Sequence, residues 1–222
     1  MMMKRNIKNL TFALPVLIFA LFFARGLEAK AVDERIYIAP AGAVDGKVLE
    51  DIKSELPKLL PMTVHMEIVP AEKLSESAYN PARKQYNAGS LLDDIAGRNN
   101  LVTTRETMLV VTDVDLYSGE PDFVFGLANP KTKICIVSLA RLNNEFYGLK
   151  PDNKLLSARA VKEAAHELGH AWGLPHCPDP KCAMFFSGSI KDTDKKRDTL
   201  CHDCKKRVRT RYTTTLFTMP VF

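Results

Sequence analysis

The segment "AAHELGHAWGLPHCPDPKCAM" at residues 164–184 constrains the fold more than any other part of the chain. It places three histidines, one glutamate, two cysteines and a methionine within twenty-one positions. If 157–172 is a helix, His166 and His170 lie one turn apart, on the side opposite to an apolar stripe. Packing does not demand histidine on that side, so the pair indicates a metal site. The apolar stripe consists of Val161, Ala164, Ala165, Leu168 and Trp172.

Two imidazoles at positions i and i+4 of a helix can bind one zinc ion, and the neighbouring Glu167 can reach a water on that ion. Gly173 predicts the end of the helix, because the residue just past a helix often adopts a left-handed backbone. The chain then turns back and brings His176 to the same site as a third ligand. Three protein ligands leave one tetrahedral position open, which is typical of a catalytic rather than a structural zinc.

Four cysteines follow the histidines in two close pairs. Cys177 and Cys182 are separated by four residues, and Cys201 and Cys204 form a C-x-x-C motif. This spacing favours a tetrahedral zinc site with four thiolate ligands. Two disulfides are the alternative, because an oxidising compartment favours them. The fifth cysteine, Cys135, lies in an apolar strand and is interpreted as a small buried residue.

Basic residues surround the second cysteine pair. We interpret them as a solvated face, and the alternative is that they compensate the negative charge of a four-thiolate zinc. His202, inside the C-x-x-C motif, is expected to point outward, and His65 is expected to be solvated on the polar side of a strand. The basic residues are Lys195, Lys196, Arg197, Lys205, Lys206 and Arg207.

Residues 1–31 have the arrangement of a secretory signal peptide. Three basic residues precede an apolar run at 10–24, and Ala29-Lys30-Ala31 is an A-x-A cleavage pattern. The alternative is an uncleaved anchor, but about twenty apolar residues are needed to span a bilayer. We therefore expect an exported protein, periplasmic or secreted, without stable membrane insertion after cleavage.

The remainder of the chain is expected to form one domain at 32–212, followed by a tail at 213–222. Without the leader, 26 basic and 25 acidic side chains remain. This balance gives no support for nucleic-acid binding, so we expect no nucleic-acid partner, and a monomer is the simplest organisation.

Sequence patterning predicts an α+β fold, a single domain built around one mixed β-sheet with an active-site helix. Helical spacing predicts helices at 46–60 and 83–98, the second ended by Gly97. Alternating or β-branched runs predict strands at 35–42, 62–69, 108–113, 123–128 and 133–139.

The motifs together resemble the archaemetzincin family of zinc metalloproteases. The resemblance rests on "HELGHAWGLPHC", "CAM" and "CHDC", and upstream on "KQYNAGSLL", "TDVDLY", "FVFGLANP" and "VSLARL". It covers roughly 34–206 and implies a metzincin-like domain with a C-terminal zinc-binding subdomain. It further implies two zinc ions, one catalytic and one structural. The leader is unlike the cytosolic members of that family.

The resemblance also assigns roles to individual residues. Glu167 is implied to be the general base, and Met184 is implied to form the floor of the site in a Met-turn. The implied ligands of the catalytic zinc are His166, His170 and His176. The implied ligands of the structural zinc are Cys177, Cys182, Cys201 and Cys204.

The leading hypothesis is an exported zinc metallopeptidase that acts on a peptide or protein substrate. Glu167 would accept a proton from a zinc-bound water and later return it to the leaving amine. One alternative is a catalytically silent zinc-binding or interaction module of the same fold. A thiol–disulfide oxidoreductase is the weakest alternative, because no thioredoxin-like strand and helix flank the C-x-x-C motif.

The strand predicted at 123–128 is a candidate for substrate binding by strand addition to a sheet edge. Its candidate residues are Phe123, Val124, Phe125 and Gly126. The glycine would permit close approach of a peptide backbone, so Gly126→Val is expected to weaken peptide binding with little loss of stability. The alternative is an interior strand that is paired on both edges.

Overall fold

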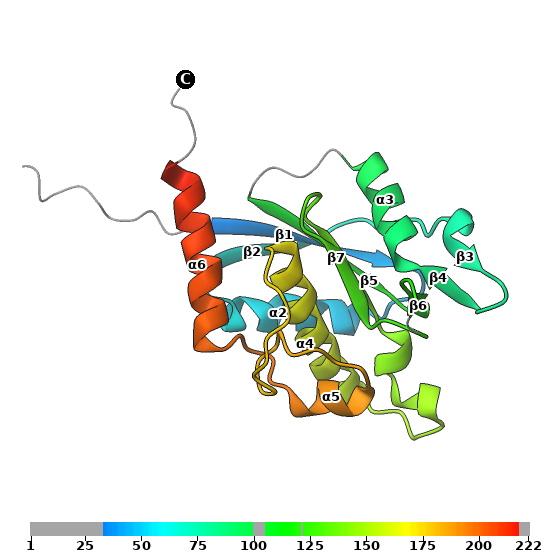
Figure 1. The fold of residues 1–222 in the computed structure, drawn as a ribbon. Coiled ribbons are helices and arrows are strands. Elements are labelled where there is room, and N and C mark those ends of the chain that lie inside the picture. The colour runs from blue at the N-terminus through cyan, green and yellow to red at the C-terminus, as the bar shows by residue number, and fades with distance from the viewer. Residues whose placement is uncertain (1–32, 100–104, 121, 218–222) are drawn as a thin grey trace, which may run out of the picture. The chain divides into compact units, whose positions relative to one another are not determined.

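The β-branched and apolar runs of the sequence form a five-stranded sheet (Figure 1). The computed structural model describes residues 33–99, 105–120 and 122–217. The sheet order is β2-β1-β5-β8-β7, with β1 parallel to β2 and β5, β5 parallel to β8, and β7 antiparallel to β8. The sheet is therefore mixed, as predicted. Its strands are β1 (Asp33–Ala41), β2 (Thr63–Ile68), β5 (Glu106–Thr112), β7 (Gly126–Asn129) and β8 (Ile134–Ser138).

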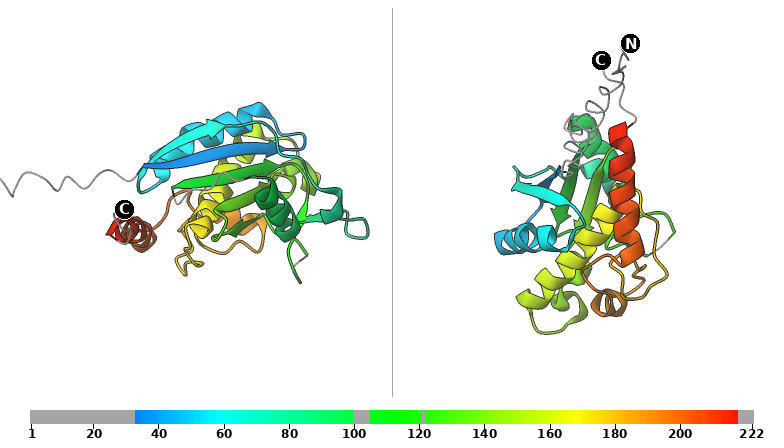
Figure 2. Two further views of the ribbon diagram at one scale, coloured as in Figure 1. Left: turned by 90° about the horizontal axis from the view of Figure 1, so that it is seen from above. Right: turned by 90° about the vertical axis from the view of Figure 1, so that its left-hand side faces the viewer.

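Helices cover both faces of this sheet. In the right-hand view of Figure 2, α2 and α4 lie below the sheet and α3 lies above it. Alternate residues of β5 and β8 therefore enter two different cores, which explains why these strands are almost uniformly apolar. The helices are α2 (Gly46–Leu59), α3 (Ala88–Arg98), α4 (Asn153–Ala171), α5 (Ile190–Lys195) and α6 (His202–Phe217).

The two cores differ in the strand residues that they contain. Leu109, Val111, Cys135 and Val137 pack with α2 and α4, in the core that also holds Met184. The intervening residues of the same strands pack with α3. Cys135 is fully buried, as expected for a small apolar residue.

The helix predicted at 83–98 is wrong in its first part. Lys84 has a left-handed backbone (φ 54°), and Gln85–Asn87 forms the short strand β4. α3 begins only after Asn87, whose side chain accepts a hydrogen bond from the amide of Ser90. This is an N-cap, and asparagine is one of the residues that favour this position. Gly97 lies inside the helix rather than at its end.

A second, three-stranded sheet has the order β3-β4-β6 and was not predicted. Strands of two or three residues are too short to show an alternating pattern. This sheet consists of β3 (Tyr79–Asn80), β4 and β6 (Leu116–Tyr117). Within the described part of the chain there are three short 3₁₀ helices: η1 (Glu76–Ala78), η2 (Ala140–Leu142) and η3 (Asn144–Tyr147).

The active-site helix α4 begins four residues earlier than predicted. Asp152 caps it by accepting a hydrogen bond from the amide of Leu155 at 2.9 Å. The predicted apolar stripe is buried. Gly173 follows the helix with φ +79°, and its amide donates to the carbonyl of His170 at 2.7 Å. The prediction that glycine turns the chain here is confirmed.

The structure describes part of the predicted tail but not the predicted leader. The leader at 1–31 lies outside the described residues. The predicted tail is helical in its first part, because α6 continues to Phe217, and 218–222 lie outside the described residues. Among the described helices, none is both long and apolar enough to cross a bilayer.

Candidate active site

Three histidine side chains converge at the end of α4. His166 and His170 come from consecutive turns of the helix, and His176 comes from the segment that folds back after Gly173. One nitrogen of each ring lies within 4.8 Å of the others. The ring centroids are 4.6, 4.7 and 5.3 Å apart. The fold thus brings together the three residues that the spacing predicted.

Main-chain carbonyls fix the orientation of two of these rings. His166 Nδ1 lies 2.8 Å from the carbonyl oxygen of Ala183, and His170 Nδ1 lies 2.7 Å from that of Leu174. A carbonyl oxygen can only accept, so each Nδ1 carries the hydrogen and each Nε2 keeps a free lone pair. This is the tautomer that a metal ligand needs.

The electrostatic environment keeps the three rings neutral. Burial lowers the pKa of His166 well below its ordinary value, and burial also lowers the pKa of His170 and His176. A neutral imidazole is the form that binds a metal ion. His166 Nε2 and His170 Nε2 are 3.1 Å apart, close to the roughly 3.4 Å between two nitrogens of a tetrahedral zinc site. The donor set and its spacing therefore fit zinc.

Glu167 lies beside the histidines and is buried against the edge of the sheet. It is 4% exposed and lines the same cleft as the three rings. Burial raises the pKa of its carboxyl group well above the ordinary value, and the nearby Glu163 raises it further. A carboxylate with raised basicity suits a group that accepts a proton.

Gly126, at the start of β7, lies where the sheet meets Glu167. A Cβ atom at this position would be 2.5 Å from the carbonyl oxygen of Ile136 and 2.6 Å from Cγ of Glu167. The glycine therefore permits the close approach of Glu167, and its role in binding a peptide stays a prediction. Because a valine side chain has no room at this position, the structure argues against the expectation that Gly126→Val would cost little stability.

We expect Gly126→Ala to destabilise the protein by about 1–3 kcal/mol, because overpacking at a fixed backbone forces neighbours to move. Gly97→Ala is the matched control. A Cβ at Gly97 meets nothing within 4 Å, so the same substitution inside α3 should stabilise by about 0.5–1 kcal/mol. Denaturant unfolding of both variants measures the two effects. Equal stability changes would contradict the assigned contact between Gly126 and Glu167.

The segment around β7 forms one wall of the cleft, but the strand is shorter than predicted. Only Gly126–Asn129 is a strand, whereas Val124 makes a single bridge to Leu116. β7 is the edge of the five-stranded sheet, so the interior alternative is wrong. Phe125 is buried, and Phe123 packs against it with ring centroids 5.1 Å apart.

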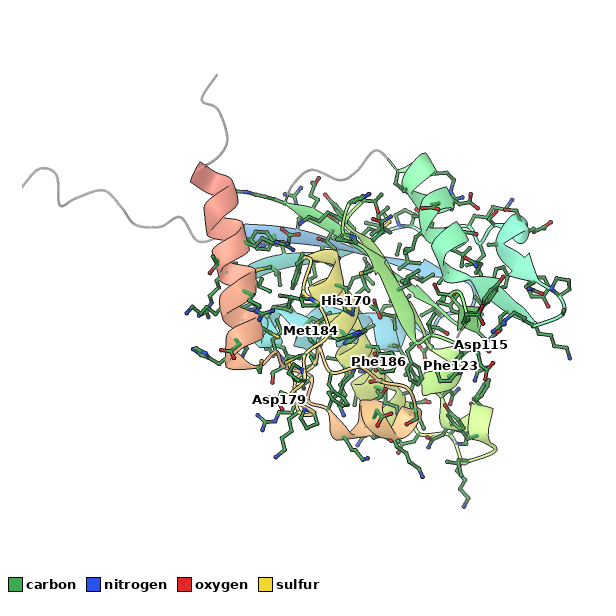
Figure 3. All side chains as sticks on the ribbon, viewed as in Figure 1. Asp115, Phe123, His170, Asp179, Met184 and Phe186 are labelled. Atoms are coloured by element: carbon green, nitrogen blue, oxygen red, sulfur yellow. The ribbon has the colours of Figure 1, made fainter. Side chains whose placement is uncertain are left out.

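Met184 packs against the active-site helix at Gly169. It is fully buried, and its sulfur occupies the space into which a side chain at Gly169 would point. Met184 and His170 lie near each other in Figure 3. The carbonyl of Met184 accepts a hydrogen bond from the amide of Cys177 at 2.9 Å. Met184 therefore packs beside the helix that carries His166 and His170, and its role as the floor of the site stays a prediction.

The four cysteines of the two pairs form a second cluster directly behind the histidines. Their sulfur atoms all lie within 4.8 Å of one another, as free thiols. Cys177 Sγ and Cys201 Sγ are 3.8 Å apart, which equals the roughly 3.8 Å expected between two thiolates of a tetrahedral zinc site. The thiol geometry fits a four-cysteine metal site. His202 lies outside the cluster and is exposed, as expected.

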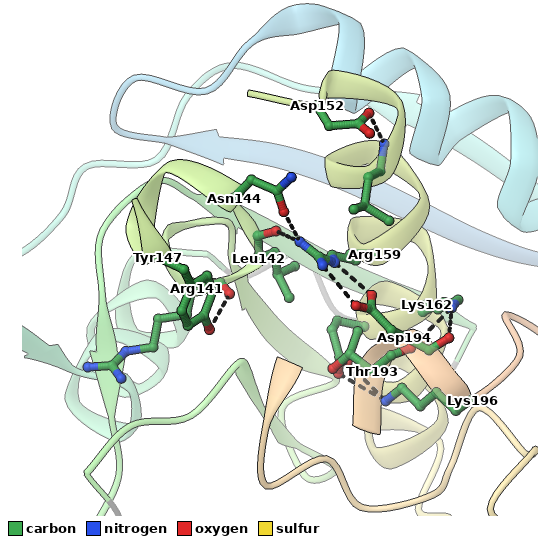
Figure 4. A network of polar contacts seen from close by, with 12 residues as sticks. Arg141, Leu142, Asn144, Tyr147, Asp152, Arg159, Lys162, Thr193, Asp194 and Lys196 are labelled. Atoms are coloured by element: carbon green, nitrogen blue, oxygen red, sulfur yellow. Dashed lines mark hydrogen bonds and ion pairs between the residues drawn. The ribbon is translucent and has the colours of Figure 1, made fainter. Parts of the chain in front are cut away.

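α5 is tied to α4 by a polar network (Figure 4). Arg159 makes two hydrogen bonds to the carboxylate of Asp194, at 2.7 and 2.8 Å. Lys162 donates to the carbonyls of Thr193 and Asp194. The segment between the Met-turn and the second cysteine pair is thereby held against the active-site helix.

A buried ion pair belongs to the same contact and was missed by the sequence analysis. Lys196 is buried, and its ammonium group lies 3.1 Å from the carboxylate of Glu163. Glu163 also accepts from the hydroxyl of Thr193 at 2.7 Å. The interpretation of Lys196 as part of a solvated face is therefore wrong. The sequence around Lys196 contains several basic residues, and nothing in it distinguishes the one that becomes buried.

Comparison with known proteins agrees with this geometry. The model of the family described as "Peptidase family M54" matches residues 44–210. The archaemetzincin of Methanocaldococcus jannaschii is 40% identical over 177 residues, which are 80% of this chain and 94% of the relative.

Two solved structures share the fold. One is the zinc-dependent peptidase from Methanocorpusculum labreanum, with a TM-score of 0.71 and 33% identity, covering 78% of this chain and 99% of that one. The other is the archaemetzincin from Methanopyrus kandleri, with a TM-score of 0.69 and 30% identity, covering 84% and 99%.

The histidine cluster, the buried glutamate and the shared fold define a zinc metallopeptidase. The chain belongs to peptidase family M54 and is similar to archaemetzincins along most of its length. The resemblance inferred from the motifs is confirmed, and so are the α+β fold and the hydrolase class.

Proposed function

We propose that the protein hydrolyses peptide bonds at the histidine cluster, with Glu167 as the general base. The observation that carries this proposal is the position of Glu167, buried in the same cleft as three neutral histidines. Metal binding alone does not require a carboxylate there. A zinc ion bound by His166, His170 and His176 would supply Lewis-acid polarisation of the scissile carbonyl. Glu167 would take the proton of the attacking water and return it to the leaving amine.

The edge of β7 supports a way of holding the substrate. The amide of Ser138 donates to the carbonyl of Phe125 at 2.8 Å. Since alternate residues of an antiparallel strand face opposite edges, the main-chain groups of Gly126 and Ala128 face away from β8. An extended peptide can pair with these groups and place one carbonyl beside Glu167. The cleft has a volume of about 750 Å³, and we propose a peptide or protein chain as its occupant.

The cysteine cluster supports a second zinc ion with a structural role. With four protein ligands the site is closed, and no position remains for a reacting water. We propose that the loaded protein contains two zinc ions, that it is a monomer, and that it is exported through its leader. The intact mass of the protein recovered outside the cytoplasm tests the export proposal, since retention of residues 1–31 would contradict cleavage.

Removal and return of zinc test the peptidase proposal. We expect the zinc-loaded protein to cleave members of a peptide library, to lose this activity when a chelator removes the metal, and to regain it when zinc is restored. Mass spectrometry of the peptides identifies the cleaved bonds. Absence of cleavage by the fully loaded protein would instead favour the silent zinc-binding module of the same fold.

A further inference from the structure

We propose that a polypeptide substrate of this peptidase also contacts a surface beyond the cleft, which we call the aromatic track. It is formed by Phe123, Phe146 and Tyr147 around the guanidinium group of Arg141. The track is suited to a large apolar or aromatic side chain on the C-terminal side of the scissile bond. The inference rests on the proposed function, because it concerns the substrate of the same site.

Ring and cation contacts connect the track to the cleft without a break. Phe123 lines the cleft, and its position beside the site can be followed in Figure 3. The Cζ atom of Arg141 lies over the Phe123 ring, 4.3 Å from its centroid, and over the Phe146 ring, 4.7 Å from its centroid. Phe146 packs against Tyr147 with ring centroids 5.2 Å apart. A substrate that leaves the cleft past Phe123 therefore meets Phe146 next.

The outer end of the track is exposed. Phe146, Tyr147 and Leu149 are 47%, 41% and 59% exposed, and they stand within four residues of the chain. Among the described residues, this is the densest run of exposed large apolar side chains. Adjoining exposed apolar groups of this kind mark an interaction site more often than isolated ones do. Their continuity with the cleft identifies the substrate chain as the occupant.

Hydrogen bonds hold two side chains of the track in place. Arg141 donates two hydrogen bonds of 2.8 Å to the carboxylate of Asp115. The hydroxyl of Tyr147 donates to the carbonyl of Arg141 at 2.9 Å. A preformed surface costs less conformational entropy on binding than a mobile one. Because Asp115 already pairs with the guanidinium, the track has no free charge to satisfy and favours an apolar side chain.

The reach of an extended peptide sets the position of this side chain. Glu167 contacts the sheet at Gly126, and Phe123 stands three residues earlier, at most about 10 Å away for a fully extended chain. The Phe146 ring is at most about 9 Å farther, because the Cζ atom of Arg141 lies 4.3 Å from the Phe123 centroid and 4.7 Å from the Phe146 centroid. A peptide that pairs antiparallel with β7, the commoner arrangement, points its C-terminal half towards Phe123. Its pairing with the strand ends at Gly126, because the amide of Val124 already donates to the carbonyl of Leu116. The contacting residue is thus at most about six positions C-terminal of the scissile bond.

Matched peptides and a matched pair of variants test the track. One peptide carries Phe five positions after a bond that the wild-type protein cleaves, a second carries Ser there, and a third carries its Phe five positions before the bond. The wild type is expected to prefer the first peptide through a lower KM. Phe146→Ser should reduce that preference, measured as a ratio of kcat/KM, by about tenfold. Tyr79→Ser is the control, since Tyr79 is 42% exposed but lies in β3.

The possible outcomes separate this inference from the proposed function. If the zinc-loaded wild type cleaves no peptide, the peptidase proposal fails and the track fails with it. If cleavage occurs but Phe146→Ser leaves the preference intact, only the track is overturned. The track would also be overturned if Phe146→Ser lowered kcat/KM equally for the Phe and Ser peptides. A preference only for the peptide with Phe before the scissile bond would overturn it as well. Dissociation of a dimer by Phe146→Ser would assign the surface to a second copy of the chain instead.

Discussion

Replacing Glu167 by glutamine is expected to lower kcat at least about 100-fold, the lower end of what a general base contributes. The zinc content should stay the same, because the expected ligands are His166, His170 and His176. Glutamine keeps the shape of glutamate and fits the close contact with Gly126, so packing should change little. Elemental analysis of the purified variant, together with its kcat on a cleaved peptide, measures both quantities.

Glu145→Gln is the matched control for this experiment. Glu145 is an exposed glutamate in η3, remote in sequence from the histidines, so the same chemical change there should leave both readouts near wild type. A Glu167→Gln protein that loses its zinc would show that Glu167 is a ligand. A variant that keeps its zinc and its full rate would show that the proton is accepted elsewhere.

Loss of one cysteine of the second cluster should have the largest effect on stability. We expect Cys201→Ser to reduce the zinc content by one ion per chain and to expose α6 to hydrogen exchange. Its thiol lies 3.8 Å from that of Cys177, and its amide donates to the sulfur of Cys182 at 3.2 Å. The binding free energy of a structural zinc contributes to folding, with apparent values of about 10–16 kcal/mol in small zinc domains. Elemental analysis and hydrogen-exchange mass spectrometry measure the two effects.

Cys135→Ala provides the control, because Cys135 is a buried cysteine outside the cluster. It should keep the full zinc content. The mass of the unreduced, alkylated protein distinguishes a four-thiolate zinc site from two disulfides. Alkylation of all four cluster cysteines after zinc release supports the thiolate site, whereas two intact disulfides among them would contradict it and leave the histidine site unaffected. The cluster cysteines are Cys177, Cys182, Cys201 and Cys204.

The parts of the site that share one helix or one turn could be predicted from the sequence. The i and i+4 spacing of His166 and His170, and the glycine that ends the helix, are local properties that tertiary packing did not override. The strands of the mixed sheet could likewise be predicted from local apolar runs. Here the local signal and the final structure agree.

Other features depend on contacts between segments that are distant in sequence. The sequence does not reveal that Glu167 packs against Gly126, so the need for glycine at that position could not be traced to this contact. Lys196 stands in a charged run, and only the carboxylate of Glu163 on another helix makes its burial possible. The stacking of Arg141 on Phe123 and Phe146 joins three segments, and no pattern within any one of them predicts the contact. Periodicity reports which face of an element is buried but not which residue lies opposite.

We expect His166, His170 and His176 to hold a zinc ion beside Glu167. Anomalous diffraction from a crystal of the zinc-loaded protein, recorded on both sides of the zinc absorption edge, shows whether they do. We predict one zinc peak bound by the three histidine Nε2 atoms, with a coordination position open towards the cleft, and a second peak among the four cysteine sulfurs. A fully occupied cysteine site with no zinc peak at the three histidines would show that the histidines do not hold the metal.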